Sequence, residues 1–450
     1  MHQFNQELEN LAKEILQYSL LRIKENPPLD GPKSENELNT LVGNTITEKG
    51  LGGSEALKIF VDVLARACIS SDHPRYLAFI PSAPSEHASL FDMVVGASAL
   101  YGGSWLEGSG AVFAENQALR WISDLANLPS SAGGVFVQGG TTGNLSALVT
   151  ARKNFKKRGK NITKWVIAAS SESHSSIKSA AEVMAAGILL VKPDKNGILQ
   201  GDTLAKAIDK YHRKNPTHQI FAVVATAGTT NLGIIDNLKS IAKVTKERKI
   251  WFHIDGAYGL AALCAPSVRK LFTGVEQADS LIVDPHKWLF APFDVCALIY
   301  RNPKLAKKAH LQKASYLETL DEKLEWNPSD YAVHLTRRAR GLPFWFSLAA
   351  NGTAEYSLAM EKTLALAQYA ASQIRANKNL TLIMEPTLSI VAFIRKDWEY
   401  SDYKSWSEKL LKDQIGFVTP SSHKGKPILR FAIVNPWTSK NDIDMILATL

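Results

Sequence analysis

The spacing of apolar residues changes along the chain and divides it into three parts. Up to about residue 95, apolar positions recur at helical spacing, as in Leu8–Leu16 and Ala56–Ile69, and a Pro- and Ser-rich stretch over 73–85 predicts a loop. From about 96 to 340, short apolar runs alternate with helical stretches. The runs predict strands at 135–137, 165–168, 188–191, 221–225, 251–255, 280–283 and 295–300.

The last part of the chain has a different order of elements. It predicts helices at 353–375, 403–412 and 442–450, with strands at 388–394 and 428–433. We therefore expect an α/β protein with an N-terminal helical segment (1–95), a large domain (96–340) and a smaller C-terminal α+β domain (341–450). The strand–helix alternation predicts a mainly parallel central sheet covered by helices, with ligand residues in the loops at strand ends.

Composition and charge narrow the function classes. The chain has 450 residues, 45% hydrophobic and 21% charged, which is typical of a globular protein. A formal net charge of +9 favours anionic ligands. The densest basic run, 152–160, contains one aromatic residue and no nucleic-acid motif, so we interpret it as a solvated helix end. We expect no nucleic-acid partner.

Cysteine use and the N-terminus indicate the compartment. Cys68, Cys264 and Cys296 are far apart and form no CxxC pair, so neither a metal site nor a disulfide framework is predicted. The first residues are polar, and no apolar stretch reaches membrane-spanning length. We therefore expect a soluble cytoplasmic protein without a membrane partner.

A glycine-rich segment, Gly139–Asn144, lies between a predicted strand and a predicted helix. Glycine lets backbone amides approach an anion, and the hydroxyl groups of Thr141 and Thr142 add donors at the helix N-terminus. A phosphate is the ligand that this chemistry favours. The alternative is a tight turn, which needs glycine as well.

Two further polar residues follow predicted strands. His174 lies among serines and could stack on a planar ring, although a helix cap is the alternative interpretation. Asp255 ends an apolar strand, where a carboxylate is costly unless it is paired or solvated. A protonated ring nitrogen would supply that partner, and Gly256 and Ala257 would leave room for the ring. The alternative for Asp255 is a helix N-cap.

Lys287 stands in the sequence Pro285–Trp288, directly after the predicted strand at 280–283. A lysine shielded from water at this edge of the sheet should have a lowered pKa and act as an amine nucleophile. The alternative is an ordinary surface charge.

In this order, the glycine-rich turn, His174, Asp255 and Lys287 resemble the group II pyridoxal 5′-phosphate (PLP) dependent decarboxylases, which include the aromatic-L-amino-acid and glutamate decarboxylases. The resemblance covers about residues 70–350. It also rests on Ala225–Thr230, Ser315–Leu317, Asp330–Tyr331 and Thr336–Gly341. It implies the PLP-dependent transferase fold of type I.

The resemblance also implies roles at the cofactor. Lys287 would bind PLP as a Schiff base, His174 would stack on the ring, and Asp255 would pair with the pyridine nitrogen. The phosphate and ring would further contact Gly140, Thr141, Thr142, Thr230, Ala257 and His286. After CO2 leaves, Tyr316 would reprotonate Cα. Aldehyde-forming relatives carry Phe at this tyrosine or Asn at the stacking histidine, so this chain is expected to form the amine.

The substrate pocket implied by the resemblance consists of two loops, with Phe79, Ile80, Pro81, Ser82, Tyr101 and Gly103. Gly103 replaces a bulky aromatic residue and is expected to open space. An aromatic L-amino acid is the leading substrate, and 2,4-diaminobutyrate, glutamate and aspartate stay open. Glu107 could favour a cationic substrate, but we interpret it as a solvated loop residue.

Two further expectations concern charge and assembly. Asp284 replaces an Asn of the aromatic decarboxylases near the phosphate, so it should turn away or be paired otherwise. The resemblance implies a homodimer with shared active sites, in which Tyr316 and the Tyr101 loop serve the neighbouring cofactor. The N-terminal segment would then hold the dimer together.

Two other functions compete with decarboxylation. One is transamination on the same scaffold, with Arg430 binding the α-carboxylate, although decarboxylases of this family also carry an arginine there. The other is a non-catalytic basic binding protein, which would hold no chromophore.

Overall fold

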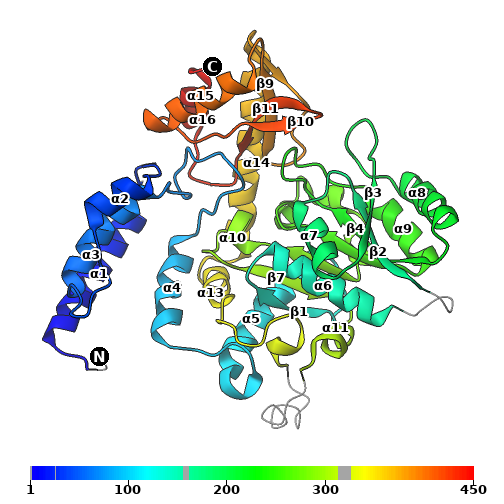
Figure 1. Ribbon diagram of the computed structural model, residues 1–450, viewed down its shortest axis with the longest axis horizontal. Coiled ribbons are helices and arrows are strands. Elements are labelled where there is room, and N and C mark those ends of the chain that lie inside the picture. The colour runs from blue at the N-terminus through cyan, green and yellow to red at the C-terminus, as the bar shows by residue number, and fades with distance from the viewer. Residues whose placement is uncertain (1–2, 26, 156–161, 313–325) are drawn as a thin grey trace.

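The computed structural model describes residues 3–25, 27–155, 162–312 and 326–450. The chain begins with three helices, α1 (Gln6–Lys24), α2 (Glu35–Val42) and α3 (Gly53–Ile59), and α3 continues as a π-helical turn over Phe60–Leu64 and a 3₁₀ turn over Ala65–Ala67. No residue of α1, α2 or α3 is buried. Figure 1 shows these helices apart from the central sheet, with α4 (Glu86–Ala97) in between.

Helix α5 (Trp105–Leu125) leads into the sheet and was not predicted from the sequence. Ser104 is its N-cap: the Ser104 Oγ accepts from the backbone N–H of Glu107 at 3.3 Å and donates to the Glu107 carboxylate at 2.7 Å. Glu107 is thus part of a helix N-terminus, with an exposed side chain. Satisfying the first-turn amides in this way is the usual role of such a pair.

Seven strands form the central sheet, in the order β1-β7-β6-β5-β4-β2-β3. Only β7 runs antiparallel to its neighbours, β1 and β6, so the predicted mainly parallel sheet is confirmed. The strands are β1 (Gly133–Val137), β2 (Lys164–Ser170), β3 (Gly187–Val191), β4 (His218–Thr226), β5 (Trp251–Asp255), β6 (Ser280–Val283) and β7 (Cys296–Tyr300).

Apolar cores cover both faces of this sheet because successive strand residues point to opposite sides. Val223 and Ala225 of β4 join the largest core, whereas Ala222 and Val224 pack with Leu148 in a second core. The helices of this part are α6 (Gly140–Asn154), α7 (Ser175–Val183), α8 (Gly201–Lys214), α9 (Leu238–Arg248), α10 (Pro285–Trp288) and α11 (Pro303–His310). Burial on both faces explains the continuous apolar runs in the sequence.

Helices α13 (Leu342–Asn351) and α14 (Thr353–Ala376) lead into a separate antiparallel sheet in the order β10-β11-β9-β8. Figure 1 shows α14 reaching from the large sheet toward this smaller one. Its elements are β8 (Leu380–Leu382), β9 (Ile390–Arg395), α15 (Tyr400–Lys412), β10 (Ser421–His423), β11 (Lys426–Ala432) and α16 (Lys440–Leu447). The sequence predicted β9 and β11 but missed the two three-residue strands.

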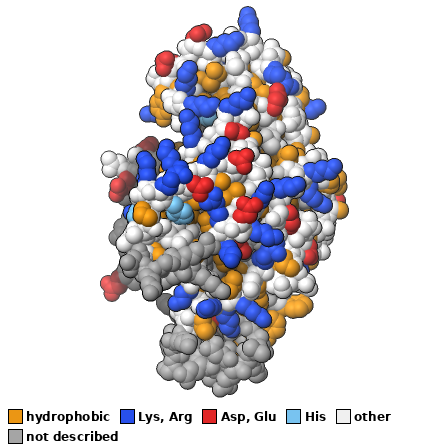
Figure 2. All heavy atoms as spheres, turned by 90° about the vertical axis from the view of Figure 1, so that its right-hand side faces the viewer, with side chains coloured by type: hydrophobic (Ala, Val, Ile, Leu, Met, Phe, Trp, Pro, Cys, Tyr) orange, Lys and Arg blue, Asp and Glu red, His pale blue; other side chains and the backbone are white. Residues whose placement is uncertain are grey.

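The surface adds two observations. Figure 2 shows Lys and Arg side chains spread over one face and mixed with acidic ones. Within the described ranges, no helix combines the length and apolar character that crossing a membrane requires.

Candidate active site

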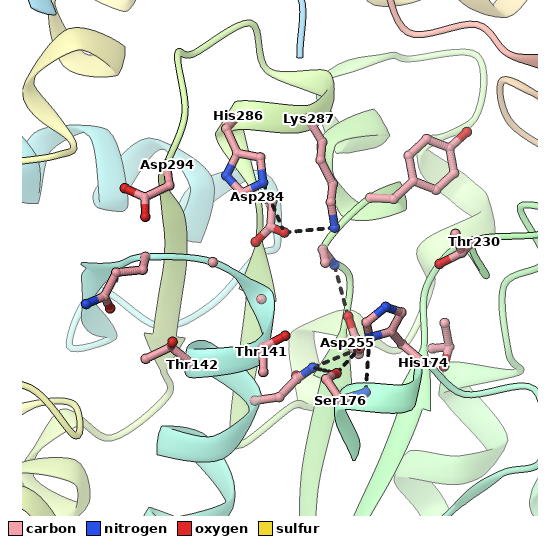
Figure 3. Close-up of a pocket in the computed structure, with 18 of the residues that line it drawn as sticks. Thr141, Thr142, His174, Ser176, Thr230, Asp255, Asp284, His286, Lys287 and Asp294 are labelled. Carbon is pink, nitrogen blue, oxygen red and sulfur yellow. Dashed lines mark hydrogen bonds and ion pairs between the residues drawn. The ribbon is translucent and has the colours of Figure 1, made fainter. Parts of the chain in front are cut away.

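A cavity of about 400 Å³ opens at the carboxyl ends of the central strands. Thr226 ends β4, Asp255 ends β5, Asp284 follows β6 and Gln138 follows β1, and all four residues line the cavity. Parallel strands deliver their exit loops to one edge of a sheet, which is why residues far apart in sequence meet here. Figure 3 shows the side chains that line the cavity.

The glycine-rich segment forms one wall of the cavity. Helix α6 begins at Gly140, and its N-cap, Gly139, makes no side-chain capping bond. A Cβ at Gly140 would lie 3.2 Å from Asp284 Oδ2 and 3.3 Å from the Ala257 Cβ, so the close approach favours glycine. With Thr141 beside it (Figure 3), this helix N-terminus has the free amides and hydroxyl groups that suit a phosphate.

Asp255 lies on the cavity wall and is 5% exposed. Its Oδ1 accepts from the backbone N–H of Ala257 at 3.2 Å, and its Oδ2 accepts from Nδ2 of Asn144 at 3.0 Å. Both carboxylate oxygens therefore have a donor, while the side chain still reaches the cavity. It is not the N-cap of a regular helix, because the next helical element is a 3₁₀ turn that begins at Gly259.

His174 is both a helix cap and a cavity residue. Its Nδ1 accepts from the backbone N–H of Ser176 at 3.2 Å and lies 2.9 Å from the Ser176 Oγ, which makes it the N-cap of α7. The imidazole also lines the cavity beside Asp255 (Figure 3). The capping interpretation is therefore correct, and it leaves the ring available to a ligand.

Lys287 reaches the same cavity from α10, and its Nζ lies 2.8 Å from Asp284 Oδ2. Burial lowers the pKa of Lys287, but the charge of Asp284 and its hydrogen bond outweigh burial, so the pKa is raised above its usual value. The predicted lowering of this pKa is thus wrong for the chain alone, because burial was weighed without the acid. Asp284 is paired otherwise, as expected.

The remaining predicted cofactor residues also line the cavity. Thr142, Thr230, Ala257 and His286 take part in its wall, together with those described above. His286 Nδ1 lies 2.7 Å from the carbonyl oxygen of Val295, and burial lowers the pKa of its imidazole. Every predicted cofactor residue is therefore found around one cavity.

The donor set fits a phosphorylated pyridine aldehyde. A glycine and threonine cradle suits the phosphate, an amine suits the aldehyde, and a buried carboxylate suits a protonated ring nitrogen. Thr226 Oγ1, on the same wall, is buried without a hydrogen-bond partner among the described residues, so a polar donor or acceptor remains for a ligand.

Comparison with known proteins agrees with this chemistry. The family model described as the pyridoxal-dependent decarboxylase conserved domain matches residues 48–396. The chain belongs to this family. Its cofactor is therefore PLP, and the enzyme is a PLP-dependent carboxy-lyase.

Similar proteins include decarboxylases of different amino acids. An aromatic-L-amino-acid decarboxylase from Bacillus atrophaeus is 29% identical over 92% of this chain and 89% of its own length. An acidic amino acid decarboxylase from Xenopus tropicalis is 30% identical over 70% of this chain and 66% of its own length. The fold also matches a solved Oryza sativa TDC structure with PLP and tryptamine, with a TM-score of 0.91, 21% identity and coverage of 100% and 98%. The predicted fold is thus confirmed in this decarboxylase.

The predicted substrate residues do not line this cavity in the described part of one chain. A Cβ at Gly103 would lie 2.3 Å from the Tyr101 Oη, so the tyrosine ring occupies the space beside this glycine. The expectation that Gly103 opens space is therefore wrong within one chain: the missing side chain makes room for Tyr101 itself.

The other predicted substrate loop is divided between surface and core. Phe79 is 56% exposed and has a φ of +51°, whereas Ile80 packs against the main core. Ser82 is buried and donates to the carbonyl oxygen of Ala291 at 3.1 Å. Pro81 stands between Ile80 and Ser82 in the sequence and is buried as well. Tyr316, the predicted proton donor, lies outside the described residues.

Sequence reasoning assigned no role to several polar residues around the site. Asn144 is the last residue of the glycine-rich segment Gly139–Asn144. Ser176 is one of the serines around His174, and His253 stands two residues before Asp255. The contact between His253 and Asn144 joins positions 109 residues apart. The sequence signal that could have found these residues is their position within or next to the motifs that carry Gly140, His174 and Asp255. Arg430 is 5% exposed with Nη1 unpartnered among the described residues, but it does not line the cavity.

Proposed function

We propose that this enzyme removes the α-carboxylate of an L-amino acid, with an aromatic substrate favoured, and releases the amine and CO2. The supporting observation is that the Lys287 amine, the Asp255 carboxylate and the cradle at Gly140 line one cavity of about 400 Å³. In a single pocket these groups can bind the aldehyde carbon, the ring nitrogen and the phosphate of the same molecule.

Each residue then has a distinct task. Lys287 binds the cofactor covalently, and Asp255 keeps a proton on the ring nitrogen through its negative charge. When bound, PLP supplies the electron sink for the pair left at Cα as CO2 departs. His174 restrains the ring from one face, while Gly140, Thr141 and Thr142 hold the phosphate.

Asp284 has a task when Lys287 is not bound to the cofactor. At 2.8 Å it holds the lysine ammonium at the cavity wall, so the amine stays close to where it must react again. Tyr316 is the proposed acid that returns a proton to Cα, on the resemblance to the family alone.

The aromatic preference rests on similarity over most of the chain to an aromatic-L-amino-acid decarboxylase. Similarity to an acidic amino acid decarboxylase keeps glutamate and aspartate as outcomes of the test. The purified enzyme should be supplied with PLP and with each common L-amino acid, and CO2, amine, keto acid and aldehyde measured. Release of CO2 with equal amine supports the proposal, and a keto acid without CO2 contradicts it.

Covalent attachment is tested separately. Borohydride reduction of the PLP-loaded enzyme, followed by peptide mapping, should place the modification on Lys287. The variant Lys287→Ala should lose it, whereas Lys13→Ala, at an exposed salt-bridged lysine of α1, should retain it. A protein that stays colourless with PLP would refute the enzyme assignment.

We also propose a cytoplasmic homodimer with shared active sites. Helix α1 buries no residue, yet it carries apolar side chains that are at least 40% exposed, namely Leu8, Ile15, Leu16, Leu20 and Leu21. On α5, Leu106 is 66% and Phe113 is 57% exposed. A second copy that covers these residues would remove a large apolar surface from water.

Light scattering should give twice the chain mass of 49.4 kDa. Shared sites have a sharper test: mixing Lys287→Ala chains, which cannot bind the cofactor covalently, with Tyr316→Phe chains, which should not form the amine, should restore amine formation at one site per mixed dimer. A monomer mass, or no recovered activity in a verified mixed dimer, would contradict the shared-site arrangement.

A further inference from the structure

A chain of buried hydrogen bonds leads to Asn144 and Ser176, which line the cavity. Nε1 of Trp251 donates to the Ser280 Oγ at 2.8 Å, and this Oγ lies 2.8 Å from Nδ1 of His253. On the other side of the imidazole, Nε2 lies 2.8 Å from Oδ1 of Asn144. The chain thus connects β5 and β6 with helix α6.

At Asn144 the chain divides into two branches. Its Nδ2 donates to Asp255 Oδ2 at 3.0 Å and to the Ser176 Oγ at 3.0 Å. The Ser176 Oγ in turn lies 2.9 Å from Nδ1 of His174. One amide nitrogen therefore contacts Asp255 directly and His174 through a single hydroxyl group (Figure 3).

The donor and acceptor types of these groups allow every hydrogen bond in the series from Trp251 to Asp255 to run in the same direction. An ionised Asp255 can only accept, so the amide NH2 of Asn144 faces it and the amide oxygen faces His253. That oxygen can only accept, so His253 carries its proton on Nε2, and Nδ1 accepts from Ser280. The indole of Trp251 can only donate to the Ser280 Oγ, which leaves the hydroxyl proton of Ser280 free to point at Nδ1 of His253.

The second branch has one arrangement as well. Because Asn144 donates to the Ser176 Oγ, the hydroxyl proton of Ser176 is free to point at Nδ1 of His174. The backbone N–H of Ser176 also donates to this nitrogen, at 3.2 Å. His174 thus carries its proton on Nε2, the nitrogen left for the cavity.

Burial makes these contacts consequential. Asn144, Ser176, His253, Asp255 and Ser280 are all between 0% and 5% exposed. A buried polar group that loses its partner is costly, and each donor in such a series strengthens the next hydrogen bond. Burial also lowers the pKa of His253 to about 4, against the opposing charge of Asp255, so the imidazole is neutral near pH 7 as the chain requires.

We propose that His253 and Asn144 are positioning residues for the reaction. His253 fixes the amide of Asn144, and this amide holds the Asp255 carboxylate toward the ring nitrogen and completes the contacts of His174. The inference rests on the proposed roles of Asp255 and His174. It adds two residues that need not touch the cofactor to perform this task.

The bond direction can be measured without the cofactor. In the ¹⁵N-histidine-labelled apo-protein, imidazole nitrogen shifts should show His253 as the neutral Nε2–H tautomer near pH 7. Signals are assigned with the His253→Gln and His174→Asn variants. A charged His253, or its Nδ1–H tautomer, would overturn the proposal.

The positioning role needs variants that separate hydrogen bonding from packing. His253→Phe keeps the ring and removes the donor, whereas His253→Gln keeps a donor toward Asn144. His310 is a matched control, since it is 8% exposed and contacts the same helix through Thr150 and Ser146. His310→Phe therefore removes a similar buried imidazole that does not reach the site.

We expect His253→Phe to weaken PLP binding on the order of tenfold, as for one lost buried hydrogen bond. With ring-¹⁵N-labelled PLP bound, it should also shift the nitrogen signal toward the unprotonated form. His253→Gln should restore both values to near wild type, and His310→Phe should change neither. Asn144→Ala, a second variant in case His253→Phe does not fold, should have at least the same effect.

The outcomes separate the two proposals. Unchanged PLP affinity and ring-nitrogen signal in both His253→Phe and Asn144→Ala would overturn the positioning role while the proposed function stands. Equal losses in His253→Gln and His310→Phe would also overturn it, because they would indicate packing alone. Failure of the wild-type protein to bind PLP, or an unprotonated ring nitrogen there, would instead contradict the proposed function.

Discussion

Replacing Arg337 by methionine is expected to lower the free energy of unfolding by about 3–5 kcal/mol. The guanidinium is fully buried and donates to both oxygens of Glu115, at 2.7 and 2.8 Å, and to the carbonyl oxygen of Gly102 at 2.5 Å. Methionine would leave the Glu115 carboxylate, 3% exposed, with the backbone N–H of Gly341 at 2.8 Å as its only donor in the described part of the chain. A buried charge without its counter-charge is the cause of the loss.

A double variant tests this reasoning. Arg337→Met together with Glu115→Leu should recover much of the stability, since no charge is then left unpaired. Arg375→Met is the matched control, because Arg375 pairs with Glu385 at 2.6 Å with side chains 49% and 65% exposed. The control should cost less than about 1 kcal/mol.

Urea unfolding of the PLP-loaded enzyme, followed by circular dichroism at one protein concentration, gives these values. We also expect the single Arg337 variant to raise KM more than it lowers kcat, because Gly102 belongs to the Tyr101–Gly103 loop, which serves the neighbouring site in the proposed shared-site dimer. A loss no larger than that of Arg375→Met, or a double variant no more stable than the single one, would refute the argument.

Three further predictions follow from single contacts. Asp284→Asn should lower the pKa of Lys287, because it removes the negative charge beside the ammonium. An amine-reactive reagent should then label Lys287 faster in the apo-protein at pH 8, as measured by mass spectrometry. An unchanged labelling rate would contradict this. Burial raises the pKa of Asp236 to about 7. Its contribution to stability is therefore complete below pH 4 and declines by up to about 4 kcal/mol as pH rises through 7, so Asp236→Asn should remove this part of the pH slope in urea unfolding. Gly134→Ala should lower the melting temperature strongly, because the new Cβ would lie 1.8 Å from a carbonyl oxygen of β7, whereas Gly96→Ala has open space and should not.

The sequence predicted the central sheet well for a physical reason. Strands buried on both faces appear as continuous apolar runs, and all seven runs became strands. The three-residue strands β8 and β10 were missed because so few residues carry no periodicity. Helix α5 was missed although its start carries a capping pair.

Part of the site was predictable from motifs and part was not. Lys287 and Asp255 follow apolar strands, so the parallel sheet brings them to one edge. The raised pKa of Lys287 depends on which way the Asp284 side chain turns, and local sequence does not encode that orientation. Likewise, the replacement of a bulky aromatic residue by Gly103 predicted open space. The Tyr101 ring fills that space, and the sequence alone does not show this packing.

Helix α6 has a consequence for which ligands the cavity accepts. Its first residue, Gly140, belongs to the anion cradle, and Asn144, one turn later, supports Asp255. The helix rises by about 6 Å over the four residues from Gly140 to Asn144, and its hydrogen bonds keep this distance fixed. Helix α6 therefore fixes the distance between the phosphate cradle and the Asp255 carboxylate. A pyridine whose phosphate arm is longer or shorter could make the contact with the cradle or the contact with Asp255, but not both. The cavity therefore selects its cofactor by length as well as by charge.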